Sequence, residues 1–228
     1  MKTNHRMMSL SAALLAAMAI AAGSVIAGEP SKGDKGAAPA AKAGGNEASP
    51  KGVKIGDKAP DFTLKDTNGK EVKLSSYTGK IVVLEWFNDD CPVVKQAHED
   101  KSTMVNIASE FAPKGVVWIA IDSTNTKHAN YGVNKDTVKS WGMDYPVLQD
   151  PDGKVGHAYG ATNTPHMFII GKDGKLAYKG AIDNDQRHEK PAAERVNYVK
   201  QALNQLTNGE TVTEPETRAY GCTVKYGS

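Results

Sequence analysis

The chain has 228 residues, of which 39% are hydrophobic and 24% are charged, and it contains two cysteines. This length and composition suit one globular domain with appended segments and exclude a small disulfide-stapled fold. The formal net charge is +2, and Lys and Arg do not interleave with aromatic residues, which argues against a nucleic-acid partner.

Residues 1–27 predict a cleavable secretory signal peptide. Basic Lys2 and Arg6 precede an alanine-rich apolar stretch, and small residues follow it before Gly28. The alternative is a membrane anchor, but the apolar stretch is short for a bilayer span. We therefore expect a periplasmic or secreted protein that does not span the membrane after signal cleavage.

Residues 28–50 consist almost entirely of Gly, Ala, Pro, Lys, Ser and acidic side chains. Such a composition buries too little apolar area to offset the entropy of ordering, so we interpret it as a disordered linker. The folded domain is expected over residues 51–208, followed by a C-terminal tail, 209–228, that carries Cys222.

Apolar periodicity sets the order of elements in the domain. It predicts a hairpin over residues 61–77, a buried strand over 81–87, a helix over 92–111, a strand over 115–122, a helix over 134–143 capped by Asn134, a short strand over 145–150, two strands over 164–182 around the turn "KDGK", and a closing helix over 190–206. This alternation indicates an α/β fold with a mixed central sheet and helices on both faces.

The order of elements, Cys91 at the start of the first long helix and the dipeptide Thr164-Pro165 resemble the thioredoxin fold. The segment "IGDKAPDFTLKDTNGKEVKLSSYTGKIVVLEWF" resembles the peroxiredoxin-like redoxin family, the relatives of alkyl hydroperoxide reductase and thiol-specific antioxidant. The resemblance covers about residues 53–206. It implies a thioredoxin-like fold with an N-terminal β-hairpin extension and a thiol-based oxidoreductase that needs no cofactor. The implied partners are a disulfide-containing protein or a peroxide as substrate and an external thiol reductant.

Cys91 is the candidate nucleophile. A helix N-terminus stabilises a thiolate through unpaired N–H groups and the helix dipole, and Pro92 suits the first helical position. Asp89 and Asp90 oppose this by like charge, whereas Lys95, one turn on, favours the thiolate if it folds back. The alternative is a buried structural cysteine.

Glu85 interrupts an apolar strand, where a carboxylate is costly unless protonated or partnered. The resemblance implies a buried acid here that relays protons to the cysteine through a water. Burial should raise its pKa and suit it to general acid–base work. The alternative is that strand twist turns Glu85 towards a solvent-lined edge.

Several residues are assigned to substrate binding. The resemblance implies a cis bond before Pro165, in a loop that packs against the reactive cysteine, with the backbone of Thr164 available to an extended substrate. His166 is a base or ligand candidate, the alternative being a packed or solvated side chain, and His98 is a weaker one. Trp86, Asn88 and Pro92 complete the predicted set.

Three departures from the related families bear on activity. Val94 stands where thioredoxin-type reductases carry the second cysteine of Cys-x-x-Cys. Leu84 and Asn88 stand at the Pro and Thr positions of the peroxiredoxin pattern, although the Asn88 amide can still donate to a peroxide oxygen. No arginine matches the peroxide-site arginine, which puts fast peroxide reduction in doubt.

Cys222 lies in the tail, within "TRAYGCTVKYGS". A second thiol there can resolve a sulfenic acid or mixed disulfide formed on Cys91. The alternative is a permanent structural disulfide, which two cysteines in a secreted chain suggest by default.

Three functions therefore compete. The first is a thiol-based oxidoreductase that uses Cys91, Glu85 and Cys222 as catalytic residues. The second is a copper-binding or copper-delivering protein with Cys91 and His166 as ligands, helped by Met167, although such proteins usually carry paired cysteines. The third is a non-catalytic interaction module with the same fold.

Overall fold

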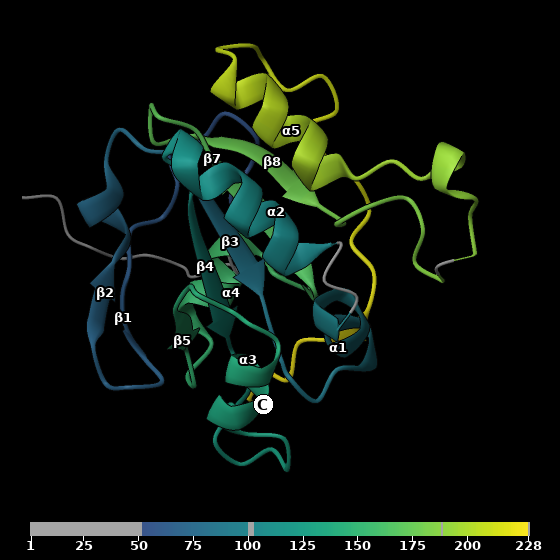
Figure 1. Ribbon diagram of the computed structural model, residues 1–228. Coiled ribbons are helices and arrows are strands. Elements are labelled where there is room, and N and C mark those ends of the chain that lie inside the picture. Colours follow the sequence, from purple (N-terminus) through teal and green to yellow (C-terminus); the bar gives the residue numbers. More distant parts are fainter. Residues whose placement is uncertain (1–51, 100–102, 188, 228) are drawn as a thin grey trace, which may run out of the picture. The chain divides into compact units, whose positions relative to one another are not determined.

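The computed structural model describes residues 52–99, 103–187 and 189–227 (Figure 1). The predicted signal peptide, 1–27, and the predicted linker, 28–50, lie outside the described residues. In the part of the chain that is described, no helix is both long enough and apolar enough to cross a membrane.

A mixed sheet of seven strands forms the centre of the domain, in the order β2-β1-β5-β4-β3-β7-β8. β3, β4 and β5 run parallel, and the other neighbours are antiparallel. The strands are β1 (Thr63–Asp66), β2 (Glu71–Lys73), β3 (Val82–Trp86), β4 (Val117–Asp122), β5 (Val147–Gln149), β7 (His166–Ile170) and β8 (Leu176–Gly180). The predicted α/β fold with a mixed sheet and an N-terminal hairpin is confirmed.

β3 and β7 are buried on both faces, which explains their nearly continuous apolar sequences. Because side chains alternate across a strand, Leu84 and Trp86 enter one core cluster and Val83 enters the other.

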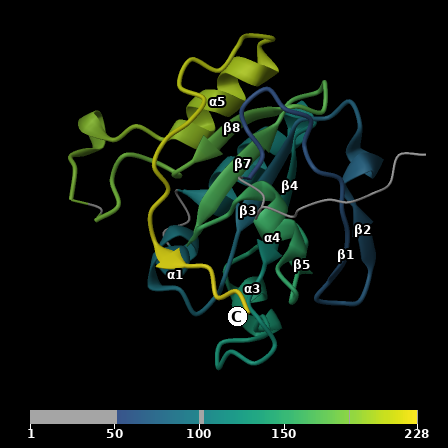
Figure 2. The same cartoon turned by 180° about the vertical axis from the view of Figure 1, so that it is seen from behind.

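Helices lie on both faces of the sheet (Figures 1 and 2). α2 (Met104–Phe111) and α5 (Tyr198–Thr207) pack on the face that carries Val83, together with Ala97 of α1 (Pro92–Glu99). α4 (Lys154–Tyr159) contributes Tyr159 to the opposite cluster. The shorter segments are α3 (Lys135–Ser140) and the 3-10 turns η1 (Leu74–Tyr77), η2 (Ala112–Lys114) and η3 (Ala192–Glu194).

Several element boundaries differ from the sequence prediction. The helix expected over 92–111 is described as α1 and α2, with residues 100–102 outside the described part. α5 begins only at Tyr198, because the side chain of Asn197 accepts from the N–H of Lys200 and caps the helix there. α4 was not predicted, since six residues that include a glycine show no clear helical period. Asn134 caps α3 as expected.

A second, two-stranded sheet joins the tail to the domain. β6 (Asn163–Thr164) pairs antiparallel with β9 (Cys222–Thr223), so that Thr164 lies opposite Cys222. Figure 2 shows the tail, in yellow, running along the domain from α5 past β8 to α1. The tail is therefore packed along the domain, in contact with the segment that precedes Pro165.

Candidate functional site

Cys91 directly precedes α1, and its carbonyl accepts the N–H of Lys95 in the first turn of the helix (2.9 Å). Its side chain is 3% exposed. The Sγ atom lies 3.0 Å from the carbonyl oxygen of Thr164 and 2.7 Å from Sγ of Cys222. The fold thus brings together two sulfur atoms that are 131 positions apart in the chain.

The surroundings shift the pKa values of the two thiols in opposite directions. Burial alone would raise the pKa of Cys91, but hydrogen bonds from the Cys222 thiol, from the backbone of Val94 and from the side chain of Thr164 outweigh burial, so the pKa is lowered. Burial and the adjacent Cys91 sulfur raise the pKa of Cys222 to about 11, although Lys225 opposes this. The arrangement favours a thiolate on Cys91 with the proton on Cys222.

Of the charged residues near Cys91 in sequence, Asp90 lines the same pocket as the sulfur, whereas Asp89 and Lys95 have other partners. Oδ2 of Asp89 accepts the N–H of Asn134, while its Oδ1 is buried without a hydrogen-bond partner in the described residues. Asp90 is exposed, and Lys95 forms an ion pair with Glu99 (3.8 Å). Backbone groups and Cys222, rather than Lys95, therefore stabilise the thiolate.

The peptide bond between Thr164 and Pro165 is cis, as the resemblance implied. His166 follows at the start of β7 and is buried against Phe168, with its Nδ1 facing the N–H of Thr162 (3.3 Å). Burial, helped by the charge of Lys179, lowers the pKa of His166 to about 4. The ring is thus packed and neutral near pH 7. This agrees with the alternative of a packed side chain rather than with a base or a ligand.

A pocket of about 220 Å³ lies beside the two sulfur atoms. Its lining includes Cys91, Cys222, Asn88, Asp122, Thr124 and Lys225. These polar side chains are connected, because Nδ2 of Asn88 donates to Oγ1 of Thr124 (2.8 Å) and the N–H and hydroxyl of Thr124 donate to Oδ1 of Asp122 (2.9 and 2.5 Å). Burial raises the pKa of Asp122 to about 6.

Asp122, Thr124 and Lys225 were not among the site residues predicted from the sequence. A signal for Asp122 was present, since it ends β4 beside the end of parallel β3, and the carboxyl ends of parallel strands meet at one edge of a sheet. Thr124 and Lys225 carried no such signal, because each reaches the pocket from a loop or from the tail.

Glu85 is fully buried, on the face of β3 that packs against α1 and α2. Its Oε2 accepts from Trp118 (2.9 Å) and Tyr145 (3.4 Å), and its Oε1 lies 3.3 Å from Nε2 of His98. Burial, the largest cause, raises the pKa of Glu85, and the electrostatic interaction with His98 and the two hydrogen bonds oppose that shift. The alternative of a solvent-lined edge is wrong for this residue.

His98 links the buried acid to the helix of Cys91. Its Nδ1 donates to the carbonyl of Val94 in α1 (2.9 Å), which leaves Nε2 facing Glu85. Its ring stacks on Trp141, which shares a cluster with Cys91 and Val94. The imidazole of His98 thus lies between the buried carboxyl group of Glu85 and the backbone of α1.

The remaining predicted residues divide into those near the sulfur and those in the core. Pro92 is the first residue of α1. Trp86 is not among the pocket residues: it is fully buried in the core, and its Nε1 donates to Ser123 (3.0 Å). Met167 packs on the sheet face opposite to Phe168. No group of three or more His, Cys, Asp or Glu residues suited to a metal ion occurs in residues 52–99, 103–187 and 189–227.

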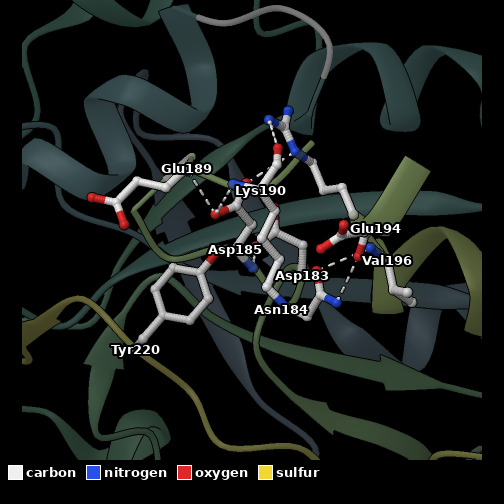
Figure 3. A network of polar contacts seen from close by, with 9 residues as sticks. Asp183, Asn184, Asp185, Glu189, Lys190, Glu194, Val196 and Tyr220 are labelled. Atoms are coloured by element: carbon white, nitrogen blue, oxygen red, sulfur yellow. Dashed lines mark hydrogen bonds and ion pairs between the residues drawn. The ribbon is translucent and has the colours of Figure 1, made fainter. Parts of the chain in front are cut away.

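A polar network after β8 reaches the tail close to Cys222 (Figure 3). The hydroxyl of Tyr220 donates to Oδ1 of Asp183 (2.6 Å), which also accepts the N–H of Asp185 (2.9 Å). Asp185 in turn accepts the N–H groups of Glu189 and Lys190 and pairs with Arg195. The network orders the loop that follows β8 and connects it to the tail two residues before Cys222.

Comparisons with known proteins agree with this geometry. The profile of the AhpC/TSA family matches residues 55–179. A thiol-disulfide oxidoreductase ResA of Bacillus thuringiensis is 32% identical over 139 residues, which cover 60% of this chain and 76% of that protein. The ResA of Bacillus subtilis is 33% identical over 124 residues, 54% of this chain and 65% of that protein.

Solved structures share the fold. An uncharacterized conserved protein from Geobacillus kaustophilus superposes with a TM-score of 0.69 at 27% identity, covering 77% of this chain and 93% of that one. A putative thiol:disulfide interchange protein DsbE from Chlorobium tepidum gives a TM-score of 0.50 at 26% identity, with 69% and 97% covered. The chain therefore belongs to the AhpC/TSA family and is a thiol-dependent oxidoreductase with a thioredoxin-like fold.

Proposed function

We propose that this chain is a secreted or periplasmic oxidoreductase in which Cys91 is the nucleophile and Cys222 the resolving cysteine. The observation that carries the proposal is the 2.7 Å approach of the two sulfur atoms, together with the lowered pKa of Cys91 and the raised pKa of Cys222. The signal-like sequence of residues 1–27 supports the location.

With a disulfide substrate, the Cys91 thiolate attacks one sulfur and forms a mixed disulfide, and the other substrate sulfur leaves as a thiolate. Cys222 then loses its proton and attacks Sγ of Cys91, which releases the second substrate thiolate and leaves the Cys91–Cys222 disulfide. An external dithiol reduces this disulfide, is itself oxidised, and restores both thiols.

With a peroxide substrate, the Cys91 thiolate attacks one peroxide oxygen and becomes a sulfenic acid, while the other oxygen leaves and is protonated to an alcohol or water. The Cys222 thiol condenses with the sulfenic acid, releasing one water and forming the same disulfide. Both substrates therefore converge on one oxidised state, which the external thiol reductant reverses.

The neighbouring residues have separate roles in this scheme. Thr164 and Pro165 form the wall against the sulfur, and Asn88 offers an amide to the reactant in the pocket. Pro92 begins the helix that stabilises the thiolate, and His166 packs behind the wall. Glu85 holds a proton and relays it to Cys91 through a water.

The experiment is intact-mass analysis with thiol alkylation, on wild type and on the Cys222→Ser and Cys91→Ser variants. In wild type, one equivalent of peroxide or of a disulfide should convert both free thiols into a Cys91–Cys222 disulfide. A reductant should then restore the two thiols. Cys222→Ser should stop at a sulfenic acid or mixed disulfide on Cys91, because the resolving thiol is absent.

Cys91→Ser serves as the control, since burial, the largest cause of the raised pKa of Cys222, remains in this variant and should keep its thiol unmodified near neutral pH. An unreactive Cys91, or a link that persists in excess reductant, would favour a non-catalytic module with a structural disulfide.

A further inference from the structure

The last part of the tail, residues 215–227, is a continuous strap across the site, and it is anchored on both sides of Cys222 (Figure 2). The first anchor is β8. The N–H of Lys179 donates to the carbonyl of Pro215 (3.0 Å), and the N–H of Thr217 donates back to Lys179 (3.1 Å). Oγ1 of Thr217 also accepts the N–H of Ala181 (2.9 Å). Since β8 ends the sheet, the strap covers its edge.

The second anchor lies directly before Cys222. The Tyr220 hydroxyl donates to the buried Asp183 (2.6 Å), and Nδ2 of Asn163 donates to the carbonyl of Gly221 (3.2 Å). Gly221 has φ +116°, and a Cβ atom there would lie 2.2 Å from the carbonyl oxygen of Thr164. Only glycine permits the strap to approach Thr164 this closely.

The third anchor follows Cys222. The N–H of Val224 donates to Thr162 (3.1 Å), and the N–H of Asn125 donates to Lys225 (2.8 Å). Tyr226 donates to the carbonyl of Ala161 (2.8 Å) and stacks on His157. Contacts on both sides therefore hold β9 in place on β6.

β9 occupies the backbone edge next to the nucleophile. The pairing of Thr164 with Cys222 uses backbone groups to which an incoming polypeptide strand would add. Sγ of Cys91 is within 3.0 Å of the Thr164 carbonyl oxygen, so a cysteine on a polypeptide must pass this edge to reach it. With the strap docked, Cys91 is 3% exposed, and the pocket that it lines has a volume of about 220 Å³.

We propose that the strap determines substrate size. While it is docked, Cys91 reacts with small disulfides or peroxides that fit the pocket, and polypeptide thiols and disulfides reach it only after the strap leaves β6. The inference rests on the proposed function, because it requires Cys91 to be the reacting group. Gly221 and Tyr220 are the positioning residues for this selection.

The test compares two reagents with the same chemistry and different size on the full chain. Cys222→Ser makes Cys91 the sole thiol. The first reagent is a small pyridyl disulfide, and the second is the same pyridyl disulfide attached to a small folded protein. Absorbance of the released thiopyridone gives both rates, and the readout is the ratio of the second rate to the first.

Gly221→Ala in this background should displace the strap, because the new Cβ would collide with Thr164. The rate ratio should rise by about tenfold or more, which corresponds to a loss of about 1.4 kcal/mol in the free energy of strap docking. Tyr220→Phe should raise it less. The control is Gly209→Ala in the same background. Gly209 also has a positive φ (+80°), but no atom lies within 4 Å of the new Cβ, and the substitution should leave the ratio unchanged.

Hydrogen exchange of residues 215–227 reports whether the strap has left β6 in each variant. Two outcomes overturn the proposal. The first is a protein-to-small-reagent rate ratio that stays at the Cys222→Ser value in a variant whose strap is released. The second is a rate ratio near one while the strap is docked. Failure of Cys91 to react with either reagent in every variant would instead contradict the proposed function.

Discussion

At the residue scale, the wall of the pocket contains a carboxyl group whose ionisation opposes folding. Burial, the first cause, raises the pKa of Asp122 from 3.8 to about 6, and the charge of Asp89 adds to the shift. Between these two pH values the unfolded chain loses this proton while the folded chain keeps it. Stability is therefore lost as the pH rises through this window.

Asp122→Asn should remove this loss, because the amide oxygen still accepts from Thr124 and carries no charge. The variant should match wild type in unfolding free energy near pH 3.5 and exceed it by up to about 3 kcal/mol above pH 7, from the pKa difference. Urea unfolding at the two pH values measures this. An equal difference at both pH values would contradict the ionisation argument.

The ionisation of Glu85 should affect the rate of thiol exchange. Its raised pKa places its ionisation above the usual range of a glutamate, so the rate of thiol exchange should change with pH as this group titrates. Glu85→Gln keeps an acceptor for Trp118, and should slow exchange by about tenfold to hundredfold and remove that part of the pH profile.

Stopped-flow measurement of Cys91 oxidation across pH makes this comparison. Glu110→Gln, at an exposed glutamate of α2, is the control and should retain the wild-type profile. A Glu85→Gln profile that overlays wild type would rule out proton transfer by Glu85.

At the element scale, α4 and the end of the strap are fitted to one another. A Cβ atom on Gly156 would lie 2.3 Å from the Tyr226 hydroxyl and 2.9 Å from Oγ of Ser123. Alanine is normally the better residue inside a helix, but here the contact with Tyr226 should outweigh helix propensity. The glycine of α4 therefore makes room for the tail.

Gly156→Ala should destabilise the protein by about 1–3 kcal/mol, the usual range for overpacking. In a Tyr226→Ala background the same substitution should be much less harmful, because the main obstacle has gone. A double-mutant cycle by thermal unfolding measures the coupling, which we expect to be about 0.5–3 kcal/mol. Strict additivity of the two substitutions would show that α4 and the strap do not contact one another in solution.

At the scale of the whole molecule, the redox state should control stability. The two cysteines are 131 positions apart, so their disulfide closes most of the domain into one loop and restricts the unfolded chain strongly. Loop-closure entropy sets an upper value of about 5 kcal/mol for the stabilisation.

The oxidised protein should therefore unfold at a higher urea concentration than the reduced protein. Cys222→Ser should unfold at the same concentration under both conditions, since it cannot close the loop. An identical midpoint for oxidised and reduced wild type would mean that the link does not constrain the domain. A stabilised disulfide also has a lower reduction potential, which limits the external thiols able to reverse it.

Local sequence was enough for many of the elements. β3 and β4 were predictable because buried parallel strands are short continuous apolar runs, and Asn134 because its side chain caps the residues that follow it. The start of α5 was misplaced, since a helix-like composition before Tyr198 does not show where the cap lies. Cys91 was recognisable as a residue at a helix N-terminus because Pro92, which follows it, suits the first helical position.

The site could be predicted only in part. The resemblance implied a buried Glu85, with a solvent-lined edge as the alternative, but its partners Trp118, Tyr145 and His98 come from other elements and could not be predicted. Trp86, its neighbour in the strand, points to the opposite face and into the core, so adjacency in sequence was a poor guide to adjacency in the site.

The sequence by itself determined the α/β architecture and the position of a cysteine at a helix N-terminus, because periodicity, caps and breakers act over a few residues. Only the tertiary structure decided that Cys222 meets Cys91, that β9 covers the edge of β6, and that Asp122 lines the pocket. These contacts join residues distant in the chain, and they exist because strand order and the path of the tail bring them to one end of the sheet.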